Sequence, residues 1–180
     1  MRTGGFEYAD ALHAHEKALR AIQVNDAESL CAYLKGFWEF IYNYKMFNCV
    51  YDIYNDNVEV YRENGFVLEG IPAVERNIMS MCTAFPDLQV EIATIFAAPK
   101  GKDAYQVWMR YYFTGTNKGP SIYGPPTGLK LEREKALNLS SFQVAKVDDE
   151  WLIVSEKTGR CCDYIRATCT GDKSLTSLEL

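Results

Sequence analysis

The chain changes character at one point, where the stretch AFPDL at residues 84–88 ends a helical pattern and a β pattern begins. Pro86 ends the preceding helix because a proline disfavours helical conformation in the residue before it. Downstream, FTGTNKG at 113–119 and PPTG at 125–128 carry the glycines and prolines of tight turns. Helices followed by an antiparallel meander predict an α+β fold in which a curved sheet wraps around helices.

Apolar residues at helical spacing predict four helices before Pro86. We expect them over residues 7–24, from about 26 to 43, over a short stretch ending near Tyr54, and from about 71 to 85. Asp26 precedes the second helix and is a favourable N-cap residue. The first helix is an extension, and we expect the main domain to cover 26–158.

Alternating apolar residues predict the strands, which we place at 58–61, 88–94, 105–114, 131–147 and 151–157. In the strand 105–114, Met109 and Tyr111 point to one face, with Val107 and Phe113. Trp108, Arg110 and Tyr112 point to the other face. Residues 160–180 show no clear period, so we expect 159–180 to be a C-terminal tail.

Composition narrows the classes of partner. The formal net charge of −5 argues against nucleic acid and against an anionic membrane surface. Six cysteines are scattered without ligand spacing, and we find no signal peptide or membrane span in the sequence, so we expect a cytoplasmic protein with reduced thiols. We expect no metal and no cofactor, since His13 and His15 are the only histidines and neither lies near a cysteine pair.

The ordered motifs resemble the SnoaL-like polyketide cyclase family of the NTF2-like superfamily over about 42–157. The anchors are Asn55-Asp56, Glu69-Gly70, AFPDL, FTGTNKG, PPTG and the late hairpin that ends in Trp151-Leu152-Ile153. The resemblance implies a conical α+β barrel, a homodimer formed through the sheet face, and an apolar pocket between sheet and helices for a small hydrophobic molecule.

The resemblance also implies an acid/base aspartate near Lys157 or Thr158, and a histidine on the preceding strand, between Leu137 and Ser140. This sequence has neither, and Asn138 and Ser140 are the polar residues in the histidine's place. Glu156 lies beside the aspartate's position, but strand alternation turns its side chain to the opposite face.

Other residues at positions matched by the resemblance could take the roles of the missing aspartate and histidine. Glu59 matches a polar position of the first family strand and becomes a candidate general base if it is buried, because burial raises a carboxyl pKa. Tyr42 and Tyr61 are the candidate hydrogen-bond donors to a substrate carbonyl. The alternative for Glu59 is a solvent-facing edge or an ion pair with Arg110, and for Tyr42 it is packing at a helix end.

Trp108, Arg110 and Tyr112 are candidate ligand-binding residues, with Asn138 and Ser140. Arg110 has a charge that could neutralise an anionic ligand, and Trp108 with Tyr112 would form a stacking wall. A structural ion pair and ordinary sheet packing are the alternatives for these three.

Two functions remain open at this point. One is a cofactor-independent lyase, isomerase or cyclase that acts on a carbonyl or polyketide-like compound, with Glu59 as base. The other is a non-catalytic module for ligand binding or assembly. A dehydratase of the scytalone type ranks last because it relies on pocket histidines, and the β half has none.

Overall fold

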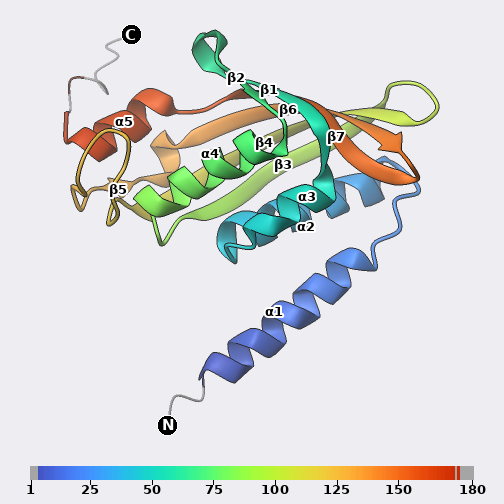
Figure 1. Cartoon of the computed structure of the whole chain (residues 1–180), viewed down its shortest axis with the longest axis horizontal. Helices are drawn as coiled ribbons and strands as arrows, with labels where there is room; N and C mark the ends of the chain where they lie inside the picture. The colour runs from blue at the N-terminus through green and yellow to red at the C-terminus, as the bar shows by residue number, and fades with distance from the viewer. Residues whose placement is uncertain (1–3, 173, 175–180) are drawn as a thin grey trace.

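The computed structural model describes residues 4–172 and 174, and places helices of the N-terminal half against one face of a curved sheet (Figure 1). The helices are α1 (Gly4–Arg20), α2 (Ala27–Asn43), α3 (Val50–Ile53), α4 (Ile71–Ala84) and α5 (Cys162–Thr170), with 3₁₀ turns η1 (Phe47–Cys49), η2 (Glu63–Gly65) and η3 (Arg133–Lys135). Asp26 caps α2, since its side chain accepts a hydrogen bond from the backbone N–H of Ser29 at 2.8 Å.

The sheet has the order β2-β1-β7-β6-β4-β3, and β5 pairs with the end of β4. Its strands are β1 (Tyr54–Tyr61), β2 (Val67–Glu69), β3 (Gln89–Pro99), β4 (Ala104–Thr116), β5 (Lys130–Leu131), β6 (Leu137–Val147) and β7 (Glu150–Gly159). Among the strands of the described residues, only β1 and β7 pair in parallel. The α+β class expected from the sequence is therefore confirmed.

Alternation along β4 sets the two faces of the sheet. Val107, Met109, Tyr111 and Phe113 are buried on the inner face, against the helices. Trp108 is exposed on the opposite, outer face. Both faces of the sheet carry aromatic residues. The alternation along β4 therefore divides these residues between two faces but does not indicate which face lines a cavity.

Alternation is interrupted once in β7. On the β6 side Ile153 pairs with Val144 and Ser155 pairs with Gln143, so Val154 is an extra residue and forms a bulge. The pairing with β1 shifts at the same place. Ile153 faces inward before the bulge, and Glu156 faces inward after it.

Three expected boundaries are corrected by the structure. The strand predicted at 131–147 is interrupted by η3, and Tyr54 starts β1 where we expected the end of the third helix. Within the segment expected as a tail, Cys162–Thr170 forms α5, which packs beside β5. Residues 175–180 of that expected tail lie outside the described residues. No helix in the described part of the chain has the length and apolar character needed to cross a membrane.

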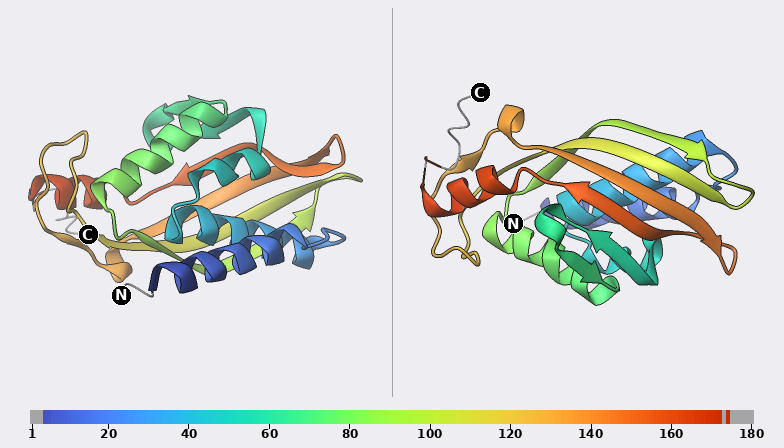
Figure 2. Two further views of the ribbon diagram at one scale, coloured as in Figure 1. Left: turned by 60° about the horizontal axis from the view of Figure 1, so that its bottom comes forward. Right: turned by 90° about the horizontal axis from the view of Figure 1, so that it is seen from above.

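The N-terminal helix α1 lies along α2 (Figure 2). His15 stacks on Phe40 at a ring distance of 5.2 Å, and Leu19 is buried against Gly36 of α2. A side chain at Gly36 would place its Cβ 2.0 Å from Leu19 Cδ2, so glycine permits this close approach. His15 is thus a packing residue on the far side of α2 from the sheet.

The motifs FTGTNKG and PPTG meet at Asn117, whose side chain is fully buried. Its amide donates to the carbonyls of Ala84 and Gly119, and its oxygen accepts from the backbone and hydroxyl of Thr127. A Cβ at Gly119 would come 1.9 Å from the carbonyl oxygen of Thr83. These two motifs therefore hold the loop between β4 and β5 against the end of α4.

Candidate functional site

Glu156 is a carboxyl group in the interior of the fold, only 2% exposed. The β7 bulge at Val154 turns it to the inner face of the sheet, where Tyr54 of the neighbouring strand β1 contacts it. A carboxyl group is seldom buried this completely unless other groups satisfy it. Its partners therefore decide what it can do.

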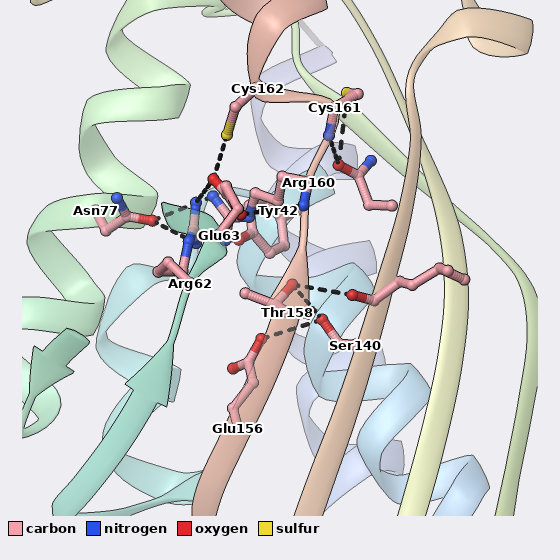
Figure 3. A network of polar contacts seen from close by, with 12 residues as sticks. Tyr42, Arg62, Glu63, Asn77, Ser140, Glu156, Thr158, Arg160, Cys161 and Cys162 are labelled. Atoms are coloured by element: carbon pink, nitrogen blue, oxygen red, sulfur yellow. Dashed lines mark hydrogen bonds and ion pairs between the residues drawn. The ribbon is translucent and has the colours of Figure 1, made fainter. Parts of the chain in front are cut away.

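Two hydroxyl groups contact the Glu156 carboxyl. Tyr54 donates a hydrogen bond to Oε2 at 2.8 Å, and Ser140 Oγ lies 3.1 Å from Oε1. Ser140 Oγ also lies 2.7 Å from Thr158 Oγ1, which donates to the carbonyl of Leu139 (Figure 3). No cation forms a salt bridge with Glu156 among the residues that the structure describes.

This arrangement satisfies Glu156 in both protonation states. An ionised carboxylate accepts the single hydrogen of Ser140. A protonated carboxyl can donate to Ser140 Oγ, which then donates to Thr158, and Thr158 to Leu139. A group that exchanges a proton with a ligand needs such a partner set, because neither state leaves a buried polar atom unpaired.

Burial is the main cause that raises the pKa of Glu156 above its ordinary value, since it disfavours the charged form. The positive charge of Arg160 and the hydrogen bond from Tyr54 act in the opposite direction. A carboxyl group with a raised pKa is a stronger base when ionised and suits general acid–base chemistry near neutral pH.

Aromatic side chains pack around this carboxyl group in a buried cluster of the core, and we call this cluster the inner chamber. Its buried walls are Trp38 and Tyr42 from α2, Tyr54 from β1, Tyr111 and Phe113 from β4, and Phe142 from β6. Trp38 Nε1 and Tyr111 Oη are buried in it and have no hydrogen-bond partner among the described residues. These two groups are unpaired donors for the oxygen of a ligand that enters between the packed rings.

Arg160 lies at the end of this cluster that faces α4, between Tyr42 and Asn77, and we call this end the mouth of the chamber. Its Nη2 donates to the hydroxyl of Tyr42 at 3.3 Å, and its Nη1 donates to Asn77 Oδ1 of α4 at 3.1 Å (Figure 3). Burial raises the pKa of the Tyr42 hydroxyl, while Arg160 lowers it. Beside Arg160 is a cavity of about 100 Å³ between α4, α5 and the β4–β5 loop, lined among others by Arg62, Asn77 and Phe85.

Three predicted site residues lie inside the fold. Tyr42 is 1% exposed and lines the chamber, and Ser140 contacts Glu156. Asn138 is also buried, but its amide donates to the carbonyl of Ala136 and its oxygen accepts from the backbone of Cys161. Asn138 therefore ties the start of β6 to the chain that enters α5.

Glu59 and Tyr61 lie on the outer face, so the solvent-facing alternative for Glu59 is the one that the structure shows. Glu59 is exposed, and it accepts a hydrogen bond from the hydroxyl of Tyr61. Glu59 and Tyr42 do not share one pocket, because alternation in β1 turns Val58 and Val60 inward and Glu59 outward, so Glu59 is not the base. The expected alternative of an ion pair with Arg110 is not formed either among the described residues.

The remaining predicted ligand-binding residues are also on the outer face. Trp108 stacks on Phe96 at 5.0 Å, and the two line a groove of about 700 Å³ together with Arg110 and Tyr61. Tyr112 lies outside this groove, under the guanidinium of Arg133 at 4.2 Å from the ring centre. The structure thus brings Trp108, Arg110 and Tyr61 together around this groove, whose lining also includes Ser140, whereas Tyr42 does not line it.

Sequence reasoning placed Glu156 on the wrong face and did not single out Tyr54 or Arg160. The alternation rule holds only for an uninterrupted strand, and the bulge at Val154 reverses it for every later residue. Arg160 lies in the segment that we expected as a tail. A buried carboxyl next to an implied acid/base position was the signal that could have identified Glu156.

Metal ligands do not gather anywhere in the described part of the chain, where no group of three His, Cys, Asp or Glu side chains could hold an ion. The chemistry available in the chamber is therefore that of one carboxyl, several hydroxyls and a guanidinium.

Comparison with known proteins agrees with this architecture. The model of the family described as SnoaL-like polyketide cyclase matches residues 32–158. No curated protein matches the chain. The solved structures that it resembles include a protein of Jannaschia sp. CCS1 described as a SnoaL-like polyketide cyclase, with 13% identity, a TM-score of 0.57 and coverage of 76% of this chain and 90% of that one.

Two further structures share the fold. One is an NTF2-like superfamily protein of Salmonella enterica serovar Typhimurium LT2, with 12% identity, a TM-score of 0.55 and coverage of 69% of this chain and 83% of that one. The other is a ketosteroid isomerase-like protein of Erwinia carotovora, with 18% identity, a TM-score of 0.52 and coverage of 69% and 87%. At these identities the likeness concerns the α+β cone alone.

The buried carboxyl predicts how stability depends on pH. A carboxyl whose folded pKa is raised stabilises the fold below its ordinary pKa of 4.5, and this contribution is lost as the pH rises through the folded pKa. The free energy of unfolding of Glu156→Gln, relative to the parent chain, should therefore increase from pH 4 to pH 8. Each unit by which the pKa is raised contributes about 1.4 kcal/mol.

Urea unfolding at a series of pH values measures this difference, and Glu59→Gln is the matched variant that removes an exposed carboxylate. A relative stability of Glu156→Gln that falls between pH 4 and pH 8 would contradict the raised pKa.

Proposed function

Because the chain belongs to the SnoaL-like polyketide cyclase family, we propose that it is a cofactor-independent enzyme of the cyclase, isomerase or lyase type. Its substrate is a small hydrophobic compound with a carbonyl group. The reaction begins with removal of a proton from the carbon beside that carbonyl. All three reaction types share this first step, and it requires a base and a donor to the enolate oxygen.

One observation carries the proposal, which is the burial of Glu156 without a cationic partner but with hydroxyl partners for both of its protonation states. A binding module has no need for such a group, because a buried carboxyl costs stability when ionised. Glu156 also lies within two residues of the place where the family resemblance implies the acid/base aspartate, on the same strand.

In the proposed mechanism the Glu156 carboxylate removes the proton and becomes a carboxylic acid. The developing enolate oxygen accepts hydrogen bonds from the chamber, where Tyr42 and Tyr111 are the hydroxyl candidates. Arg160 beside Tyr42 makes its hydroxyl a better donor. Tyr54 holds the carboxyl in place through Oε2 and leaves Oε1 to Ser140 and the substrate.

The second half of the reaction returns the proton. In an isomerisation Glu156 donates it to another carbon of the enolate. In a cyclisation the enolate carbon attacks a second carbonyl, and the proton goes to the new alkoxide. In a lyase reaction the enolate expels a leaving group, which takes the proton. The contacts around Glu156 are compatible with each of these reactions, and the base is the same in all three.

We also propose that two copies of the chain associate through the outer face of the sheet. Tyr61, Phe96, Trp108 and Leu139 are exposed apolar residues around the outer groove, and Phe96 is 55% exposed. Exposed apolar surface of this extent is typical of interfaces. Charges of both signs border this surface, since Glu59 is negative and Arg110 and Lys157 are positive. In a two-fold dimer the same surface of each copy faces the other, so opposite charges can meet across the interface.

The state of the cysteines supports a reducing compartment, for which we propose the cytoplasm. All six cysteines are free, although Cys161 and Cys162 are adjacent in the chain. Oxidising compartments favour paired cysteines.

Exchange of substrate protons with solvent tests the proposed activity. The protein is incubated in D₂O with three neutral aromatic ketones (acetophenone, 1-indanone and 2-tetralone), and deuterium incorporation beside the carbonyl is followed by NMR. We expect accelerated exchange of at least one ketone, and a loss of about 10²- to 10⁴-fold in Glu156→Gln, the range that a general base contributes.

Glu59→Gln is the matched control and should retain the parent rate, because that carboxylate lies on the outer face. If the parent protein accelerates none of the three ketones, or if Glu156→Gln exchanges as fast as the parent, the enzyme proposal is wrong and the binding module takes its place.

Sedimentation velocity tests the dimer. The parent chain should sediment as a dimer, and Trp108→Glu should be monomeric because it places a charge in the centre of the apolar interface. Phe66→Glu introduces the same charge at an exposed aromatic residue outside the groove and should remain dimeric. A monomeric parent, or a dimeric Trp108→Glu, would exclude this interface.

A further inference from the structure

Two arginines meet at the mouth of the chamber and share one neutral acceptor. Arg62 Nη1 donates to Asn77 Oδ1 at 3.2 Å, and Arg160 Nη1 donates to the same oxygen at 3.1 Å (Figure 3). Arg62 follows β1 directly and Arg160 follows β7, so the parallel pairing of these strands brings the two guanidinium groups side by side. An amide oxygen holds them in place but does not neutralise them.

The carboxylate that contacts this arginine pair is that of Glu63, and other donors largely occupy it. Glu63 accepts from the backbone N–H of Arg160 at 3.3 Å and from the thiol of Cys162. Its Oε1 lies 3.9 Å from Arg62, near the limit of an ion pair. Within contact distance, two guanidinium charges therefore face the single carboxylate of Glu63, and Glu156 interacts with them only through its charge.

The arginines keep donors for a ligand. A guanidinium has five N–H donors, and Arg160 uses two of them, to Asn77 and to Tyr42. Its Nε is buried and has no partner within the described residues. An unpaired buried donor on a charged group is costly, which favours a site where a ligand completes the hydrogen bonds.

Both arginines line the cavity of about 100 Å³ at the chamber mouth. The rest of its lining includes apolar side chains, with Met81 and Phe85 from the end of α4, Ile122 from the β4–β5 loop and Ile165 from α5. The cavity thus combines a positive end with an apolar wall. An organic anion fits this combination better than an inorganic one, because its apolar body can contact the wall.

We propose that Arg62 and Arg160 bind the carboxylate of the substrate, so that the enzyme acts on a carbonyl compound that also carries an acid group. The planar, two-oxygen carboxylate matches the fork of a guanidinium. Identification of this ligand as the substrate rests on the proposed function, whereas the anion site itself rests on the arginines and the cavity.

The position of the site indicates how the substrate lies. Glu156, Thr158 and Arg160 alternate along the end of β7, so the same face of the chain holds the base, the hydroxyl relay and the anion site. At about 3.3 Å per residue the Cα atoms of Glu156 and Arg160 are separated by about 13 Å. The carboxylate would therefore stay at the mouth while the carbonyl end extends inward, past Tyr42.

Isothermal titration calorimetry of the full chain with benzoate and with benzamide, its neutral counterpart, tests the anion site. We expect benzoate to bind at least about 10-fold more tightly. Its carboxylate is charged and benzamide is neutral, and hydrogen bonds to a charged group are the stronger ones. Arg62→Gln and Arg160→Gln should each lose this preference. Arg62→Lys should keep part of it, because the charge remains without the fork.

Arg76→Gln removes an equal charge from the exposed residue beside Asn77 on α4 and should bind benzoate like the parent. The proposal is overturned if the parent does not bind benzoate, if benzoate and benzamide bind equally, or if Arg62→Lys and Arg62→Gln both bind benzoate as the parent does. Inorganic phosphate that competes more strongly than benzoate would overturn the assignment to a carboxylate.

The two proposals can fail separately. Glu156→Gln should keep benzoate binding, because it leaves the arginines in place. Benzoate binding without any deuterium exchange of the neutral ketones would remove the enzyme proposal and leave the anion site. Exchange of a neutral ketone without a preference for benzoate would remove the anion site and leave the enzyme proposal.

Discussion

The bulge at Val154 in β7 is the constraint on which the inner chamber depends. One extra residue reverses the alternation of the strand, so that Glu156 and Thr158 face the helices and Lys157 faces out. Without the bulge a lysine would lie among the buried aromatic residues and the carboxyl would lie in solvent. The neighbouring strand β1 shifts its pairing at the same place, which makes the interruption a feature shared by three strands.

The position of Glu156 then explains the polar residues around it. A buried carboxyl destabilises the fold when it is ionised, and hydroxyl donors reduce this cost without fixing the charge as a salt bridge would. Tyr54 and Ser140 provide such donors from β1 and β6, and Thr158 of β7 is the hydrogen-bond partner of Ser140. Arg160 lies further along the chain and acts on Glu156 through its charge, not through a contact. The carboxyl can thus change its protonation state within an otherwise rigid core.

Much of the fold could be predicted from the sequence, because its signals are local. Pro86 separates the helices from the strands, Asp26 caps α2, and the alternation along β4 correctly groups Tyr111 with the buried residues. The turn motifs are also structural, since Asn117 uses all of its side-chain hydrogen bonds to hold a loop on α4.

The site could be predicted only in part, because it depends on events that leave no local pattern. Tyr42 and Ser140 were placed inside, but Glu59 and Trp108 were assigned to a pocket although they face outward. Periodicity divides a strand into two faces, and both faces of β4 are rich in aromatic residues. The bulge that turns Glu156 inward has no signature in the sequence, and the arginine pair forms only when the ends of β1 and β7 are brought together.

The most direct test of the account is the titration of Glu156 itself. In a sample with ¹³C-labelled glutamate side chains, the carboxyl resonance that is missing from the Glu156→Gln spectrum is followed by NMR as the pH is raised. A midpoint clearly above 4.5, the ordinary value for this carboxyl, is the predicted result. A midpoint at or below that value would mean that the carboxyl is ionised as in water, and would contradict its role as the buried base.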